Sequence, residues 1–180
     1  MRTSWLPIVG AIALLAGQPA ALPSAAHADP AYTSNKVLDI FTKEKATRQN
    51  GASRKICFDN DPNCGAPPPP TRFDLLVNFE FNSDKLTATA RENLAQFAKA
   101  LQDPRLKGSK FEIDGHTDAT GAENYNLGLS ERRAKAVVEY LASLGVDPAT
   151  LSSHGWGKTK PRVADPFSPE NRRVESQMVE

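Results

Sequence analysis

The sequence predicts an α/β domain in which helices cover one face of a β-sheet. Short apolar segments, partly alternating with polar residues, are interleaved with longer segments whose apolar residues recur at helical spacing. This alternation of strands and helices is typical of a two-layer α/β sandwich. A stiff run of four prolines at residues 67–70 separates the region from what precedes it. Residues 71–180 are therefore expected to form one compact domain, long enough to bury its own core.

Four strands are expected in this domain, at residues 73–81, 110–115, 150–154 and 172–179. The first is mostly apolar, as a buried strand would be. In the second, Phe111 and Ile113 alternate with Glu112 and Asp114. Because successive side chains of a strand point to opposite faces, the apolar pair is expected to face the core and the acidic pair the other side of the sheet.

Two helices are expected between these strands. The first covers residues 86–101, with Pro104 just beyond its end. Its apolar stripe consists of Leu94, Phe97, Ala98 and Leu101. The second starts near Glu123, and Gly145 followed by Pro148 marks its end. Its buried stripe is expected to consist of Ala134, Val137, Val138, Leu141 and Leu144.

Residues 1–28 have the pattern of a secretory signal peptide. Arg2 is the only charged residue before Asp29, an apolar run covers residues 5–17, and Ala26-His27-Ala28 matches an A-x-A cleavage site. A membrane-spanning helix would need about 20 apolar residues, more than this run supplies. We therefore expect cleavage after Ala28 and a mature protein outside the cytoplasm, with no transmembrane segment.

Residues 29–66 form a polar segment with one amphipathic patch, Val37, Leu38, Ile40 and Phe41, that predicts a short helix. Cys57 and Cys64 also lie in this segment. In an exported protein two cysteines this close favour a disulfide. A metal site would need further ligands, and a redox-active pair usually has C-x-x-C spacing.

The charge balance excludes one large class of function. The chain has 22 Lys and Arg against 21 Asp and Glu, a formal net charge of +1. Removal of residues 1–28 takes away Arg2, after which the two signs balance. Nucleic-acid binders usually carry a strong basic excess, so no nucleic-acid partner is expected.

The densest polar signal follows the second strand, at residues 115–121 (Gly-His-Thr-Asp-Ala-Thr-Gly). If the next helix starts near Glu123, one of its sides carries Asn126, Leu129, Ser130 and Arg133. That side can face the loop that holds Asp118. A carboxylate and a guanidinium at one cleft suit a ligand with an ammonium and a carboxylate. Two alternatives stay open: Thr117 and Asp118 could cap a turn, or Asp118 and Arg133 could pair with each other.

At these residues the sequence closely resembles the OmpA-like C-terminal domain, a peptidoglycan-binding module of outer-membrane, lipoprotein and flagellar-stator proteins. The matching stretches, in the family's order, are Phe79-Glu-Phe-Asn-Ser-Asp-Lys-Leu, Gly-His-Thr-Asp-Ala-Thr-Gly, Tyr-Asn…Leu-Ser-Glu-Arg-Arg-Ala, Gly155-Trp-Gly-Lys…Pro161 and Asn-Arg-Arg-Val. They cover nearly all of residues 73–178. The resemblance implies a β-α-β-α-β-β sandwich with a mixed sheet.

The resemblance also implies roles for individual residues. Asp118 and Arg133 match the pair that holds diaminopimelate of the peptidoglycan stem peptide. The other implied pocket residues are Phe81 and Asn82 after the first strand, Leu129 as an apolar wall, Asn126 and Thr117 as loop-shaping residues, and Arg172 as a rim contact. The implied function is non-enzymatic binding of peptidoglycan in the periplasm, which anchors the protein or a partner to the cell wall.

Two other functions remain as alternatives. An enzyme acting on the cell wall would need two carboxyls across a cleft, for which Glu112 or Asp114 with Asp118 are the candidates. An adaptor would dock an envelope protein through residues 29–66. No cofactor or metal is expected, because His116-x-Asp118 supplies too few ligands for zinc. His116 and His154 are instead expected to be hydrogen-bonded loop or strand-edge residues.

Overall fold

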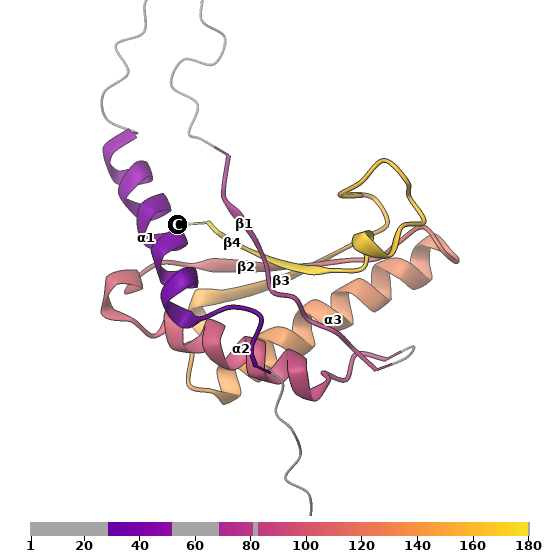
Figure 1. Ribbon diagram of the computed structural model, residues 1–180. Coiled ribbons are helices and arrows are strands. Elements are labelled where there is room, and N and C mark those ends of the chain that lie inside the picture. Colours follow the sequence, from indigo (N-terminus) through magenta and orange to yellow (C-terminus); the bar gives the residue numbers. More distant parts are fainter. Residues whose placement is uncertain (1–28, 52–68, 81–82, 180) are drawn as a thin grey trace, which may run out of the picture.

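The computed structural model describes residues 29–51, 69–80 and 83–179 (Figure 1). Four expectations lie outside these residues: the signal peptide, the Cys57–Cys64 disulfide, and the pocket roles of Phe81 and Asn82. Within the described residues, no helix combines the length and the apolar character needed to cross a membrane.

A mixed four-stranded sheet forms one layer of the domain. Its strands are β1 (Arg72–Asp74), β2 (Phe111–His116), β3 (Leu151–Gly157) and β4 (Val174–Met178), in the spatial order β1-β4-β2-β3. β2 runs parallel to β3, whereas β4 lies between β1 and β2 and is antiparallel to both. The predicted α/β class is therefore confirmed.

Two helices, α2 (Ala88–Leu101) and α3 (Glu123–Ser143), lie on one face of this sheet (Figure 1). From β1 onward the order is β-α-β-α-β-β, as the resemblance implied. Thr87 caps α2, since its hydroxyl oxygen accepts a hydrogen bond from the Ala90 amide at 3.2 Å. Leu144 was expected in the buried stripe of α3. It lies beyond the last helical residue and is 37% exposed, so that prediction is wrong.

The backbone of helix α3 packs directly against two glycines of the sheet, which fixes the distance between the sheet and the polar side chains of α3. A Cβ atom at Gly115 of β2 would collide with the carbonyl oxygen of Ser130, and one at Gly155 of β3 would lie 2.5 Å from the Glu131 amide nitrogen. Only glycine permits this approach. The hydroxyl of Ser130 reinforces it by accepting a 2.8 Å hydrogen bond from the Gly157 amide.

The helix predicted before the proline run is longer than its apolar patch suggested. Helix α1 (Ser34–Gly51) contributes Val37, Leu38 and Phe41 to the same hydrophobic core as the sheet and α2. The Phe41 ring makes edge contacts with Phe73 and Phe111 at centroid distances of 6.1 and 5.1 Å. Residues 29–51 are thus packed on the domain rather than detached from it.

The first strand is much shorter than the predicted 73–81. It ends at Asp74, and Leu76 adopts a left-handed backbone conformation with φ +48°. The Asp74 carboxylate accepts a 2.9 Å hydrogen bond from the Leu76 amide, and this local turn takes the chain out of the sheet. The apolar run continues beyond the turn, where Val77 and Phe79 line a cavity instead of extending the strand.

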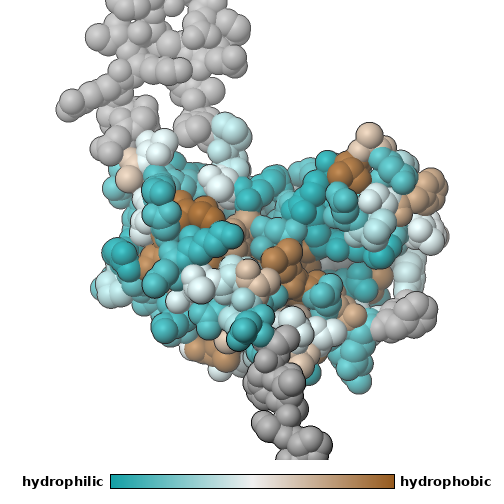
Figure 2. All heavy atoms as spheres, in the orientation of Figure 1, coloured by the Kyte–Doolittle hydropathy of each residue, from teal (hydrophilic) through white to brown (hydrophobic). Residues whose placement is uncertain are grey.

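Three short 3₁₀ helices complete the described structure: η1 (Pro104–Leu106), η2 (Pro148–Thr150) and η3 (Pro169–Asn171). The last of them lies directly before Arg172. The outer surface is predominantly hydrophilic on the face shown in Figure 2, with hydrophobic patches scattered across it.

Candidate functional site

Asp118 lies in the loop that follows β2, with 7% of its surface exposed. Its Oδ2 atom accepts a 2.7 Å hydrogen bond from Nη1 of Arg172, and its Oδ1 atom accepts one from the Thr120 amide at 3.0 Å. Burial alone would raise the pKa of Asp118, but these hydrogen bonds and the charge of Arg172 hold it below its ordinary value. Asp118 is therefore an anion at neutral pH.

The loop around Asp118 is held by residues from β3 and α3. The side-chain amide of Asn126 donates to the carbonyl oxygens of Thr120 at 3.0 Å and Asp118 at 3.4 Å. The Thr117 amide donates to the carbonyl oxygen of Gly157 at 2.9 Å. Asp118 therefore does stabilise a turn, through its hydrogen bond from the Thr120 amide, but it also forms an ion pair with Arg172. The expectation that Asp118 caps a turn thus describes part of the geometry.

Arg133 lies on the side of α3 that faces this region and is half-buried. Its Nε atom donates to the carbonyl oxygen of Ser83 at 3.2 Å, and its guanidinium lies 4.8 Å from the centroid of the Phe79 ring. No carboxylate of the described residues forms an ion pair with it, so Asp118 and Arg133 do not neutralise each other. Burial lowers the pKa of Arg133, yet a guanidinium starts so high that it stays charged.

A cavity of about 300 Å³ opens beside these groups. It is lined by Val77, Asn78, Phe79, His116, Arg133, Pro169, Arg172 and Arg173. Of the expected pocket residues, Arg133 and Arg172 line it, whereas Asp118 is not a lining residue and is linked to the cavity through its hydrogen bond with Arg172. Thr117, Asn126 and Leu129 are buried nearby and are not among the lining side chains.

His116 is a lining residue whose role was predicted wrongly. It was expected to be hydrogen-bonded, but neither ring nitrogen has a hydrogen-bond partner in the described structure, and the side chain is fully buried. Burial, together with the positive charge of Arg173, lowers the pKa of His116 to about 4. Its Nε2 atom lies 3.7 Å from Oε2 of Glu175, a distance that would count as an ion pair only for a protonated ring. At neutral pH His116 is therefore uncharged.

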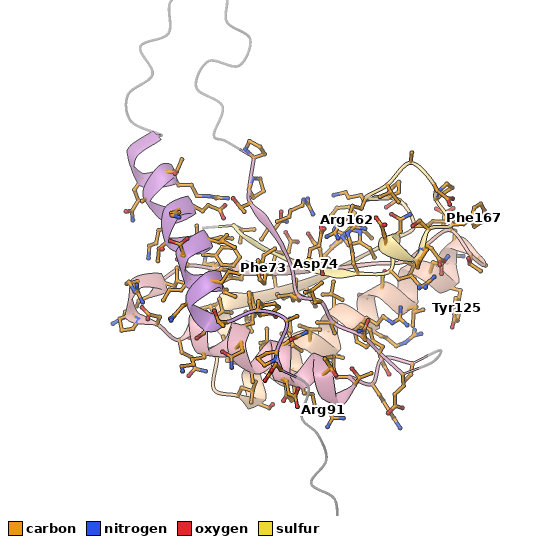
Figure 3. All side chains as sticks on the ribbon, viewed as in Figure 1. Phe73, Asp74, Arg91, Tyr125, Arg162 and Phe167 are labelled. Carbon is orange, nitrogen blue, oxygen red and sulfur yellow. The ribbon has the colours of Figure 1, made fainter. Side chains whose placement is uncertain are left out.

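Glu175 of β4 forms ion pairs with two arginines near the cavity, Arg162 and Arg173. Its Oε1 atom accepts 2.8 Å hydrogen bonds from Nε of Arg173 and Nη2 of Arg162. Arg162 also donates from Nη1 to Oδ2 of Asp74 at 2.7 Å, and both residues are labelled in Figure 3. The bonds outweigh burial and lower the pKa of Glu175 to about 2. The segment between β3 and β4 is thereby fastened to β1 and β4.

Asn171 holds the same segment from inside. Its side-chain oxygen accepts a 2.7 Å hydrogen bond from the Arg162 amide, and its side-chain nitrogen donates to the carbonyl oxygen of Asp165 at 2.8 Å. The Ala119 amide donates to the carbonyl oxygen of Pro166 at 2.8 Å, which joins this segment to the Asp118 loop. These hydrogen bonds fix the backbone of the segment before Arg172 and so position Arg172 beside Asp118.

The carboxyl groups considered for catalysis do not form a pair across this cavity. Asp114 is fully buried, and its oxygens accept hydrogen bonds from Trp156 Nε1 at 2.8 Å and Arg72 Nη1 at 3.3 Å. Burial raises the pKa of Asp114. Neither Asp114 nor Glu112 lines the cavity. Within the described ranges, no group of three or more His, Cys, Asp and Glu side chains could hold a metal ion.

The sequence of this chain is similar to those of known proteins. Residues 78–175 match the model of the OmpA family. A peptidoglycan-associated lipoprotein of Pseudomonas aeruginosa is 40% identical over 100 residues, which cover 54% of this chain and 58% of that protein. The chain spans between 30% and 58% of the length of three curated relatives from Pseudomonas and Gluconacetobacter.

Solved structures show the same architecture. The peptidoglycan-associated lipoprotein of Burkholderia pseudomallei superimposes with a TM-score of 0.51 at 31% identity, covering 57% of this chain and 87% of that one. The periplasmic domain of Helicobacter pylori MotB superimposes with a TM-score of 0.52 at 26% identity, covering 61% of this chain and 80% of that one. Helix α1 precedes the residues that match the family model.

Proposed function

Because the chain belongs to the OmpA family, we propose that it binds peptidoglycan without a catalytic step, through the diaminopimelate of the stem peptide. The names of its relatives support peptidoglycan as the ligand, since two of them are peptidoglycan-associated lipoproteins. The chemistry of the cavity supports the finer assignment. Diaminopimelate carries, at the free end of its side chain, an ammonium and a carboxylate on one carbon.

One observation carries the proposal: Arg133, a guanidinium without a carboxylate partner among the described residues, lines the same cavity as Arg172, which pairs with the Asp118 carboxylate. Asp118 would accept hydrogen bonds from the ligand's ammonium. Arg133 would bind its carboxylate with two parallel hydrogen bonds, which a planar guanidinium allows and an ammonium does not. Arg172 already contacts Asp118 at 2.7 Å, so the ligand's ammonium must share that carboxylate with it or displace it.

The rest of the expected pocket belongs to the same proposal. Phe81 and Asn82 lie outside the described residues, and their proposed role in lining the pocket rests on the resemblance alone. Thr117, Asn126 and Leu129 would not contact the ligand directly. They would stabilise the loop that carries Asp118 and the helix that carries Arg133.

Co-sedimentation with purified cell-wall sacculi tests the function. Wild-type protein should sediment with sacculi, and free diaminopimelate should release it. Asp118→Ala and Arg133→Ala should remain in the supernatant. Asp39→Asn and Arg105→Ala, which alter exposed charges on α1 and η1, should sediment like wild type. Soluble fragments released from the sacculi would contradict the non-enzymatic part, and unchanged sedimentation of both site variants would contradict the assignment.

We also propose that residues 1–28 direct export to the periplasm and that Cys57 pairs with Cys64. The pattern Arg2, apolar run and Ala26-His27-Ala28 supports the first, and an oxidising compartment supports the second. Mass spectrometry of the protein recovered from a periplasmic extract should find Asp29 at the N-terminus and no thiol that reacts with an alkylating agent before reduction. An intact Met1 or two alkylated cysteines would overturn these points.

A further inference from the structure

Phe167 is the most exposed of the large apolar side chains in the described residues, at 62%. The other members of that set are Leu76, Tyr125, Leu127, Leu144 and Val179. A single apolar side chain on a surface is ordinary, since folded proteins expose much apolar area. Two features of Phe167 bear on its role: the hydrogen bonds that fix its loop and its position relative to Asp118.

The backbone around Phe167 is fixed by short hydrogen bonds. The Asp165 side chain accepts one from the Phe167 amide at 3.0 Å, and the Asp165 carbonyl oxygen accepts one from the Asn171 side chain at 2.8 Å. Pro166 and Pro169 restrict the backbone on both sides. The aromatic ring is therefore held out from a braced loop, and little backbone entropy would be lost when a ligand packs against it.

The same loop brings Phe167 close to the proposed ligand site. The Ala119 amide donates to the Pro166 carbonyl oxygen at 2.8 Å, and these two residues adjoin Asp118 and Phe167 in the chain. Standard backbone dimensions then place the Cα atoms of Asp118 and Phe167 within about 8 Å of each other. Figure 3 shows Phe167 at the end of the molecule where Tyr125, in the first turn of α3, also projects.

We propose that Phe167 is the platform on which a sugar ring of the glycan strand packs when the stem peptide occupies the cavity. The inference rests on the proposed function and adds a second ligand class to it, a carbohydrate. A pyranose ring has one face rich in C–H groups, and the negative face of an aromatic ring attracts such weakly positive hydrogens while it removes apolar surface from water.

The length of the stem peptide agrees with the position of Phe167. The peptide is attached to a sugar of the glycan strand, and diaminopimelate lies about three residues from that attachment. At about 3.5 Å per extended residue, three residues span about 10 Å, and the diaminopimelate side chain adds about 5 Å, so the sugar lies at most about 15 Å from a group held at Asp118. That reach exceeds the distance from Asp118 to Phe167, so the sugar can pack on the Phe167 ring while the end of the diaminopimelate side chain is held at Asp118.

Calorimetric titration with two soluble probes tests the inference: a diaminopimelate-containing stem peptide, and the same peptide carrying its disaccharide. Wild type should bind the disaccharide peptide about three- to tenfold more tightly than the bare peptide, the gain expected of one aromatic contact. Phe167→Ala should abolish this gain and leave the affinity for the bare peptide unchanged. Phe167→Tyr should retain the gain because it keeps the ring face.

Leu144→Ala is the matched control, since it removes an exposed apolar side chain just beyond the opposite end of α3. It should behave as wild type with both probes. If wild type binds the two probes equally, or if Phe167→Ala keeps the full gain, the glycan platform is wrong even though the site for the peptide stands. Failure of Asp118→Ala to weaken binding of either probe would instead refute the proposed function itself.

Discussion

Oδ2 of Asp118 lies 2.7 Å from Nη1 of Arg172, 54 residues later in the chain, whereas Arg133 donates to the carbonyl oxygen of Ser83. The acid of the site is therefore paired with a cation that is 52% exposed at its side chain, and the base that would receive a ligand carboxylate is not paired with that acid. A ligand that brings both an ammonium and a carboxylate complements this arrangement, because its carboxylate can pair with Arg133 at the cavity and its ammonium with Asp118, which adjoins the cavity through Arg172.

The Asp118–Arg172 pair should be visible in the titration of Asp118. The Arg172 hydrogen bond and charge help to hold the pKa of Asp118 below its ordinary value, so Arg172→Ala should raise that pKa. Carboxyl-carbon NMR chemical shifts followed against pH would measure it. Arg105→Ala, which removes an exposed guanidinium paired with Asp103 on η1, should leave Asp118 unchanged. An Asp118 titration that is identical in wild type and Arg172→Ala would show that the pair does not persist in solution.

Arg133 should matter for ligand binding far more than for folding. It has no carboxylate partner in the described residues, so Arg133→Ala leaves no buried acid unpaired. We expect Arg133→Ala to weaken binding of a diaminopimelate-containing stem peptide about 30- to 150-fold, as loss of a charge-assisted pair of about 2–3 kcal/mol would. Arg133→Lys should recover only part of the loss, since an ammonium cannot form the two parallel bonds.

Calorimetry of binding and denaturant unfolding together measure this prediction. Arg132→Ala is the control, because Arg132 is the exposed neighbour on the same helix. A full recovery of affinity in Arg133→Lys would argue that Arg133 acts as a simple point charge, and an equal loss in Arg132→Ala would argue for a general effect of charge.

The regular elements were predictable because each depends on local pattern. The stripe through Phe97 and the stop at Gly145 mark α2 and α3 in any context. The strand predicted over residues 73–81 is correct only at its start, since β1 ends at Asp74, and it shows where pattern fails. Leu76 belongs to an apolar run that resembles a strand, yet the turn stabilised by Asp74 places it in the left-handed region and in solvent.

The site was predictable only as far as its motifs lie together in the chain. The helical spacing from Asn126 to Arg133 correctly places these residues on one side of α3. The pairing of Asp118 with Arg172, and the cluster of Arg162, Arg173 and Glu175, depend on the antiparallel return of β4 between β1 and β2. Local periodicity carries no information about that return, so the partners of each charge could not be assigned from sequence.

Burial of His116 should make the protein less stable as the pH falls from about 6.5 to about 4. The folded-state pKa of about 4 lies below the ordinary value, so in this interval the unfolded chain binds a proton that the folded protein does not. The lost free energy of unfolding is on the order of 3 kcal/mol once the pH is below the folded pKa.

Denaturant unfolding at a series of pH values measures this effect. His116→Gln should remove the slope between pH 6.5 and 4, whereas His154→Gln, at an exposed position on β3, should retain it. If His116→Gln keeps the wild-type slope, the group responsible lies elsewhere.

Glu175 should govern a second, more acidic phase of instability. Its pKa is lowered to about 2 by hydrogen bonds from Arg173 and Arg162, so its stabilising effect is complete above the ordinary carboxyl pKa and is lost as the pH falls toward 2. At neutral pH, Glu175→Gln leaves the buried Arg173 guanidinium without its carboxylate and should lower the free energy of unfolding by about 3 kcal/mol. Asp39→Asn, which breaks an exposed ion pair on α1, should cost less than about 1 kcal/mol. Equal effects of the two variants in denaturant unfolding would mean that the Glu175 cluster contributes no more than a surface ion pair.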